Sequence, residues 1–177
     1  MHIYAMRHGE SEYNVKGLCN DDPARDVPLT PGGRQQAERA AEALHRIPLD
    51  HVYCSELPRA RETAEIVAQS HEVKITPQAG LNDIRTGCDG APVEEYFRRI
   101  AHDRLQARVG DGETLLEHKQ RIMDFVAWLG TQRQYQNVLL VAHEETMRVF
   151  AACARRLSDE TMMGLSFENC EILAFDL

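Results

Sequence analysis

The sequence predicts a three-layer α/β/α domain with a mostly parallel central sheet, and three observations support this fold class. Short apolar runs of strand length lie near residues 2, 50 and 138, and each ends abruptly at polar side chains. A segment with helical periodicity follows each run, and successive strand–helix units favour parallel strands covered by helices on both faces. A length of 177 residues fits one domain with a sizeable core.

The first strand is expected over residues 2–6. Polar residues, glycine and proline then predict a loop over residues 11–29. Thr30 and Pro31 form a typical helix start, with a side-chain N-cap and a proline at the first helical position. The apolar face of this helix consists of Ala37, Ala40, Ala41 and Leu44. This spacing predicts an amphipathic helix that lies on the sheet.

The second unit begins with a strand expected over residues 50–55, which runs directly into a helical segment. One face of that segment consists of Ala60, Thr63, Ala64, Val67 and Ala68. A short edge strand is expected over residues 73–75. Residues 76–92 contain three glycines and two prolines with little periodicity, so we expect a long loop there.

The second half of the chain predicts three more helices and the clearest strand. Two helices are expected over residues 93–108 and 113–131. Residues 138–142 are continuously apolar, which is typical of a strand buried on both faces, and this strand ends at His143. The third helix is expected from about residue 146 to residue 157.

The chain closes with a strand expected over residues 171–175, and it contains no internal repeat, low-complexity tract or linker. We therefore expect a single domain over residues 1–177. The sequence is 43% apolar and 27% charged, which is ordinary for a globular protein. Its formal net charge of −8 argues against broad binding of nucleic acids or acidic membranes, because the summed field repels polyanions.

Targeting and cysteine patterns predict a cytoplasmic protein. The N-terminus has no basic region followed by a long apolar stretch, and no run approaches the length of a membrane-spanning helix. The five cysteines are widely spaced and include no C-x-x-C pair. We therefore expect reduced thiols, with neither a disulfide framework nor a zinc site.

Side chains suited to anion binding follow three of the expected strands. Arg7 and His8 follow the first strand, and Arg59 lies just past the second. His143 follows the most apolar strand. The C-terminal ends of parallel strands meet at a crevice, so we expect these four side chains to converge. Guanidinium groups match phosphate geometry, and each charge-assisted hydrogen bond contributes roughly 1.5–3 kcal/mol, so the pattern predicts an oxyanion site.

Five blocks of the sequence, taken in order, resemble the motifs of the histidine phosphatase superfamily, also called the phosphoglycerate-mutase-like family. The blocks are Arg7-His8-Gly9-Glu10-Ser11 with Asn14, residues 26–37 (DVPLTPGGRQQA), residues 54–65 (CSELPRARETAE), Gly112-Glu113-Thr114, and residues 141–148 (VAHEETMR). Five blocks in the family's order are far more specific than any single motif. The resemblance covers most of the chain and implies a phosphoglycerate-mutase-like fold.

The resemblance also implies a two-step phosphoryl transfer that uses no metal or other cofactor. A ring nitrogen of His8 would attack phosphorus to form phosphohistidine, and water would then release phosphate. Arg7, Arg59 and His143 would bind the phosphoryl oxygens and stabilise their charge. Asn14 and Ser55 are lesser candidates for phosphate contacts, with loop capping as the alternative role for each.

The sequence departs from the family pattern at the proton donor. The family commonly has a glutamate in an L-x-E segment, and the matching stretch here is Leu81-Asn82-Asp83. The family also usually has small residues after its second histidine, where this chain has Glu144 and Glu145. In the acid-phosphatase branch of the superfamily an acidic residue directly after that histidine is the proton donor, so the resemblance makes both Asp83 and Glu144 candidates for the acid that protonates the leaving oxygen. Glu145 is interpreted as an acidic residue in the first turn of a helix.

The resulting hypothesis is a phosphomonoesterase that acts on a small phosphorylated metabolite or a phosphoprotein, with no nucleic-acid or membrane partner. A phosphoglycerate-mutase-type phosphotransferase is the alternative enzyme, and a non-catalytic module that binds a phosphorylated ligand is the alternative class. The sequence does not indicate the substrate or the oligomeric state.

Three further sets of side chains receive plainer interpretations. His118 is grouped with surface or strand-end histidines because it has no metal-ligand spacing. Residues 119–121 are interpreted as a solvated helix face. Arg85, in the loop over residues 76–92, is a candidate substrate contact because binding residues often lie on loops.

Overall fold

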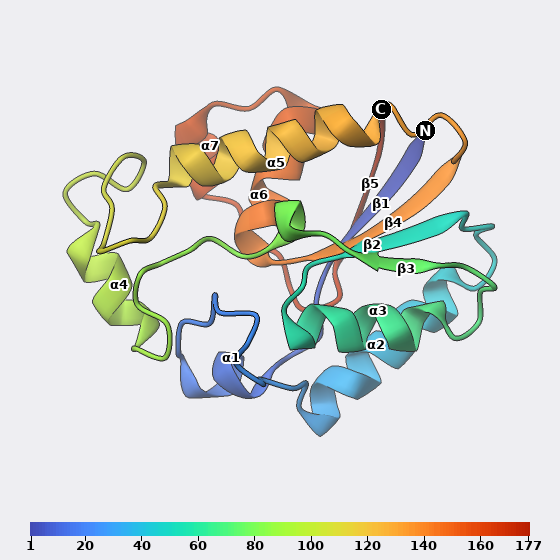
Figure 1. The fold of residues 1–177 in the computed structure, drawn as a ribbon, viewed down its shortest axis with the longest axis horizontal. Coiled ribbons are helices and arrows are strands. Elements are labelled where there is room, and N and C mark those ends of the chain that lie inside the picture. Colours follow the sequence, from blue (N-terminus) through green and yellow to red (C-terminus); the bar gives the residue numbers. More distant parts are fainter.

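Five strands form one sheet in the computed structural model, which describes residues 1–177 (Figure 1). The strands are β1 (His2–Arg7), β2 (His51–Cys54), β3 (Ile75–Pro77), β4 (Asn137–Ala142) and β5 (Ile172–Asp176). Their order across the sheet is β3-β2-β4-β1-β5, and only β5 is antiparallel to its neighbour. The predicted mostly parallel sheet is confirmed.

Helices cover both faces of this sheet, as Figure 1 shows. The helices of one face are α2 (Pro31–Leu44) and α3 (Pro58–Ala68), and those of the other face are α5 (Leu115–Leu129), α6 (Glu144–Arg155) and α7 (Asp159–Met163). The predicted three-layer α/β/α arrangement is confirmed. None of the helices combines the length and the apolar character needed to span a bilayer.

The central strand β4 contributes to the apolar cores on both faces of the sheet. Val138, Leu140 and Ala142 belong to the cluster that includes α5 and α6. Leu139 and Val141 belong to the cluster that includes α2 and α3. All five side chains are fully buried, and their alternation follows from the two-residue repeat of a strand. Burial on both faces requires a continuous apolar run, which is why the sequence predicted this strand correctly.

The stretch over residues 11–29, predicted as a loop, contains a short helix, α1 (Glu12–Lys16). Ser11 caps this helix: its side chain accepts a hydrogen bond from the backbone N–H of Asn14, and the Asn14 side chain accepts one from the N–H of Ser11. Gly17 ends the helix in the left-handed conformation, with φ of 64°. Because reciprocal capping supports this helix and no apolar stripe does, hydrophobic periodicity does not reveal it.

The predicted helix over residues 93–108 is wrong in its second half, because α4 (Val93–Arg99) ends earlier. Beyond α4, the carboxylate of Asp103 accepts hydrogen bonds at 3.0 Å from the backbone N–H groups of Leu105 and Gln106. Such local bonds from an aspartate compete with helical hydrogen bonding. The chain therefore continues as turns.

Other elements differ from prediction at their boundaries. The edge strand β3 lies slightly later than residues 73–75, and one turn of 3₁₀ helix, η1 (Ala79–Leu81), lies within the predicted loop over residues 76–92. Helix α6 begins directly after His143, which is its N-cap residue, and not at residue 146. Its first turn therefore starts at the end of β4.

The double-sided burial of β4 generates a stability prediction. We expect Leu140→Ala to lower the free energy of unfolding by about 2–5 kcal/mol, because it removes buried apolar area and leaves a cavity. Val15→Ala is the control, because Val15 is 67% exposed, and it should change stability by less than about 0.5 kcal/mol. Urea denaturation measures the free energy of unfolding of each variant. Similar decreases in Leu140→Ala and Val15→Ala would contradict the observed packing.

Candidate active site

His8 follows β1 and is almost fully buried, with an exposed fraction of 2%. Its Nδ1 lies 2.7 Å from the carbonyl oxygen of Gly9, and its Nε2 lies 2.9 Å from Nε of Arg59. A carbonyl oxygen can only accept a hydrogen bond, and a guanidinium nitrogen can only donate one. The neutral ring of His8 therefore carries its proton on Nδ1 and keeps the lone pair on Nε2.

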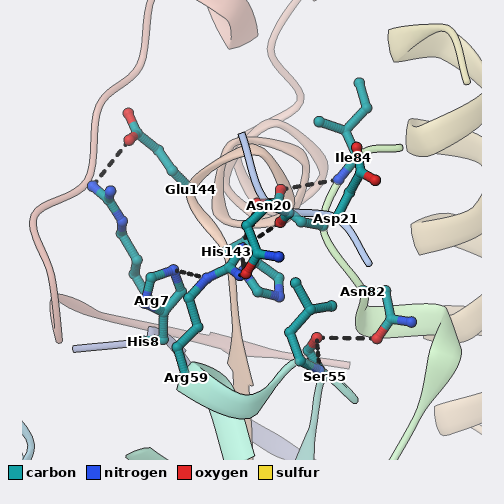
Figure 2. Close-up of polar contacts among 12 residues, drawn as sticks. Arg7, His8, Asn20, Asp21, Ser55, Arg59, Asn82, Ile84, His143 and Glu144 are labelled. Carbon is teal, nitrogen blue, oxygen red and sulfur yellow. Dashed lines mark hydrogen bonds and ion pairs between the residues drawn. The ribbon is translucent and has the colours of Figure 1, made fainter. Parts of the chain in front are cut away.

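Arg59, in the first turn of α3, is a buried cation between two histidines (Figure 2). Its Nη2 lies 3.0 Å from Nδ1 of His143 and also donates to Oδ2 of Asp83 at 3.0 Å. Nη2 donates to the carbonyl oxygen of Asn20 at 3.1 Å as well, and Nη1 donates to the Asn20 side chain. One guanidinium thus connects segments that are far apart in the sequence.

His143 follows β4 and is fully buried. Its ring centroid lies 5.1 Å from that of His8, and the two ring planes are inclined by 60°. Because Nδ1 accepts a hydrogen bond from Arg59, the neutral ring carries its proton on Nε2, which has no hydrogen-bond partner. The two imidazoles are therefore neighbours at the strand ends, but only His8 lines the adjoining cavity.

The surroundings keep both imidazoles neutral. Burial, followed by the positive charges of Arg59 and Arg7, lowers the pKa of His8 well below its ordinary value of 6.5. Burial, followed by the charge of Arg59, lowers the pKa of His143 in the same direction. At neutral pH the Nε2 lone pair of His8 is therefore free of a proton.

Arg7, at the end of β1, uses Nη1 to bind two acceptors, and Figure 2 shows the contact with one of them, Glu144. Nη1 donates to the carbonyl oxygen of Phe167 at 2.5 Å and lies 2.9 Å from Oε2 of Glu144. The other carboxylate oxygen of Glu144 accepts a hydrogen bond from Nη2 of Arg148 at 2.8 Å. Glu144 is thus shared between two guanidinium groups.

The second acidic candidate, Asp83, contacts a different part of the site. Its Oδ2 lies 3.0 Å from Nη2 of Arg59 and 3.6 Å from Nδ1 of His143. Its Oδ1 accepts a hydrogen bond from the backbone N–H of Ile84 at 2.9 Å. Asp83 therefore lies beside Nη2 of Arg59 and beside His143, whereas Glu144 lies beside Arg7.

A cavity of about 210 Å³ brings these groups together with an apolar surface. Its charged and imidazole lining includes Arg7, His8, Arg59, Asp83 and Glu144. Its apolar lining includes Leu18, Ile84, Val93, Tyr96 and Phe97. No group of three or more His, Cys, Asp or Glu side chains is arranged to hold a metal ion. Chemically, the arrangement can bind one anion next to an unprotonated ring nitrogen.

The structure separates the two lesser candidates. Asn14 lines the cavity, although its side-chain oxygen already accepts hydrogen bonds from Ser11. Ser55 does not line the cavity. Its buried hydroxyl donates a hydrogen bond to Oδ1 of Asn82 at 3.0 Å and accepts one from the N–H of Leu57 at 3.2 Å. Ser55 therefore organises the start of α3, which matches the capping alternative.

Some cavity residues lie outside the predicted set. Asn20 binds Arg59 from a connecting segment without a recognisable motif, so the sequence contains no signal for it. Glu145 lies in the first turn of α6, as predicted, but it also lines the cavity and pairs with Arg148 at 2.6 Å. Burial raises the pKa of Glu145. The three- and four-residue spacing of Glu144, Glu145 and Arg148 is the signal that could have identified this cluster.

Two interpretations of α5 are wrong. His118, predicted to be a surface or strand-end histidine, is fully buried within α5, with Nδ1 3.2 Å from Oε1 of Glu113. Arg121, predicted on a solvated face, donates to Glu113 and to several backbone carbonyl groups. Helical periodicity identifies apolar stripes and cannot show that a polar side chain has buried partners.

Arg85, a candidate substrate contact, does not line the cavity, and its side chain is 63% exposed.

Comparisons with known proteins identify relatives along nearly the whole chain. The adenosylcobalamin/alpha-ribazole phosphatase of Escherichia coli (strain K12) is 30% identical over 160 residues, which cover 86% of this chain and 78% of the relative. The probable phosphoglycerate mutase GpmB of Citrobacter koseri is 29% identical over 184 residues, which cover 99% of this chain and 85% of the relative. The solved alpha-ribazole phosphatase from Shigella flexneri aligns with a TM-score of 0.90 at 27% identity, covering 100% of this chain and 91% of that chain.

A family model described as the histidine phosphatase superfamily (branch 1) matches residues 3–177. This range includes all of the strand ends that meet at the cavity. The high TM-score agrees with a phosphoglycerate-mutase-like fold, as the five sequence blocks predict. The chain therefore belongs to the histidine phosphatase superfamily.

Proposed function

We propose that this chain hydrolyses phosphomonoesters through a phosphohistidine intermediate on His8. The observation that carries the proposal is the state of His8, whose neutral ring lines the cavity with Nδ1 bonded to Gly9 and the Nε2 lone pair free of a proton. A phosphorus atom bound beside Arg7 and Arg59 would meet a nucleophile that needs no deprotonation, once Nε–H of Arg59 leaves the Nε2 lone pair and donates to a phosphoryl oxygen instead. Relatives named as phosphatases support the same reaction class.

The first step transfers the phosphoryl group from the substrate oxygen to Nε2 of His8. The new P–N bond forms as the P–O bond breaks, and negative charge on the phosphoryl oxygens is stabilised by Arg7 and Arg59. His143 does not line the cavity, and its Nδ1 accepts a hydrogen bond from Nη2 of Arg59 at 3.0 Å. We therefore assign His143 the role of orienting the Arg59 guanidinium toward the phosphoryl group, in place of a direct phosphate contact.

The leaving oxygen needs a proton, and the geometry favours Asp83 over Glu144 as its source. Both oxygens of Glu144 are bound by guanidinium groups, those of Arg7 and Arg148, which gives Glu144 a clamping role. Asp83 contacts one guanidinium, that of Arg59, and its other oxygen accepts a hydrogen bond from the neutral backbone N–H of Ile84. Asp83 gives its proton to the departing oxygen in the first step. In the second step its carboxylate takes a proton from the water that attacks phosphohistidine, and phosphate is released.

Charges in the cavity favour an ester with an uncharged alcohol. Every guanidinium that lines the cavity is paired with a carboxylate. The pairs are Arg7 with Glu144, Arg59 with Asp83, and Arg148 with Glu144 and Glu145. The phosphoryl group can bind to Arg7 and Arg59. A second anionic group on the substrate, such as the carboxylate of a phosphoglycerate, would have no unpaired cation in the cavity lining to bind. This balance supports a phosphatase of small phosphorylated metabolites over a phosphoglycerate mutase.

Replacement of the nucleophile tests the covalent mechanism. We expect His8→Gln to lower kcat/KM for p-nitrophenyl phosphate by at least about 10³-fold, because the covalent route is lost. The wild-type protein, quenched in alkali with labelled substrate, should retain phosphate on His8. His102→Gln, at an exposed histidine, is the matched control and should keep wild-type activity.

Three outcomes would contradict this proposal. Undiminished hydrolysis by His8→Gln would remove the phosphohistidine route. Conversion of 3-phosphoglycerate to 2-phosphoglycerate in the presence of a trace of 2,3-bisphosphoglycerate would establish a mutase, whereas phosphate release without isomerisation agrees with a phosphatase. A folded wild-type protein that binds phosphate but turns over neither substrate would be a binding module.

A pair of matched substrates tests the proton donor. Nitrophenolate leaves without protonation, whereas the alkoxide of p-nitrobenzyl phosphate does not. We expect Asp83→Asn to lower kcat/KM for p-nitrobenzyl phosphate by about 10²-fold or more, and to change that for p-nitrophenyl phosphate by less than about threefold. Glu144→Gln should affect both substrates equally, because it disturbs Arg7. A loss selective for the benzyl ester in Glu144→Gln would assign the acid to Glu144 instead.

The neutral histidines generate a pH prediction for stability. The pKa values of His8 and His143 are lower in the folded protein than the ordinary 6.5 of an unfolded chain. The unfolded state therefore binds more protons just below pH 6.5, and stability falls as the pH falls, by up to about 1.4 kcal/mol per pH unit for each histidine. Urea denaturation between pH 7.5 and pH 5.5 should show a shallower decline in His8→Gln/His143→Gln. An unchanged slope would contradict the assigned neutral state.

A further inference from the structure

Arg121 lies outside the cavity, yet it holds the segment that carries Asp83. Its Nη1 donates to the carbonyl oxygens of Gly80 and Asn82, each at 3.0 Å, and its Nη2 donates to the carbonyl oxygen of Asp83 at 3.2 Å. No backbone N–H group bonds to the carbonyls of Asn82 and Asp83, so Arg121 supplies their donors. A side chain on α5 therefore fixes the backbone at the candidate acid.

Arg121 is itself fixed by a buried acidic partner. Oε1 of Glu113 accepts a hydrogen bond from Nη2 of Arg121 at 2.5 Å, and Glu113 is only 4% exposed. Nδ1 of His118 lies 2.8 Å from the same Nη2. Burial alone raises the pKa of Glu113, but hydrogen bonds from His118 and Arg121 outweigh it and lower that pKa to about 2. Glu113 is therefore ionised at neutral pH, and its carboxylate holds the guanidinium in place.

The same carboxylate also fixes the chain on the other side of Asp83. Oε1 of Glu113 accepts a hydrogen bond from the backbone N–H of Arg85 at 3.2 Å. The backbone N–H of Glu113 in turn donates one to the carbonyl oxygen of Arg85 at 2.7 Å. Asp83 thus lies in a segment anchored before and after it. With the backbone fixed in this way, Oδ2 of the short Asp83 side chain lies 3.0 Å from Nη2 of Arg59.

We propose that Arg121, braced by Glu113, is a positioning residue that sets the reach of Asp83 toward the leaving oxygen. This inference rests on the proposed function of Asp83 as the proton donor. Arg121 does not line the cavity, so it acts only through the segment it holds. A planar guanidinium can donate to several carbonyl groups in fixed directions, which the single ammonium of a lysine cannot do. Small displacements of an acid are costly to proton transfer because the donor must be within hydrogen-bond reach.

The test uses the two matched esters again, with kcat/KM as the readout because it covers the steps up to departure of the alcohol. We expect Arg121→Gln to lower kcat/KM for p-nitrobenzyl phosphate by about 10- to 100-fold and for p-nitrophenyl phosphate by less than about threefold. A merely structural role would lower both equally. Arg155→Gln, at an exposed arginine of α6, is the control and should change neither value.

Two more variants keep the result decisive. Arg121→Lys retains the charge beside Glu113 and should show a smaller but still selective loss, and it replaces Arg121→Gln if that variant does not fold. In an Asp83→Asn background, Arg121→Gln should cause no further selective loss, because both act on one group. The inference would be overturned if Arg121→Gln lowered kcat/KM equally for both esters or for neither. It would also be overturned if Arg121→Gln caused its full selective loss in the Asp83→Asn background. If Asp83→Asn itself is not selective, the proposed acid has failed instead.

Discussion

The buried guanidinium of Arg59 is the group on which the site depends. It donates to Nε2 of His8 and to Nδ1 of His143, and its charge opposes protonation of both rings. A buried cation without partners would be strongly destabilising, and here Asn20 and Asp83 accept its remaining hydrogen bonds. This side chain therefore adds to burial in keeping both imidazoles neutral, and it contacts a ring nitrogen of each.

The sheet order explains why the sequence predicted which residues meet. Strands β2, β4 and β1 are neighbours, and their registers pair Cys54 with Val141 and Arg7 with Ala142. The three strands therefore end at nearly the same level, and the residues that follow them share one edge of the sheet. Their apolar runs and abrupt polar ends are local features, so no knowledge of distant contacts was needed to place Arg7, His8, Arg59 and His143 together.

Contacts between distant polar side chains were beyond the reach of pattern analysis. Asn20 binds Arg59 from 39 residues away, and Arg121 binds the carbonyl oxygen of Gly80 from 41 residues away. An arginine on a helix has the same local pattern whether it faces water or a set of backbone carbonyl groups. Apolar burial follows from periodicity, whereas polar burial depends on partners that only the assembled fold supplies.

The acidic pair after His143 is compatible with an anion site because it is balanced by a nearby cation. Arg148, one turn further along α6, pairs with Glu144 at 2.8 Å and with Glu145 at 2.6 Å, and its side chain is only 15% exposed. An unshared Glu144 would compete with phosphate for Arg7, since both are anions. Shared with Arg148, Glu144 can orient Arg7 while part of its charge is neutralised. Glu144, Glu145 and Arg148 therefore form one electrostatic unit, in which loss of the arginine alone would leave two carboxylates beside the phosphate-binding groups.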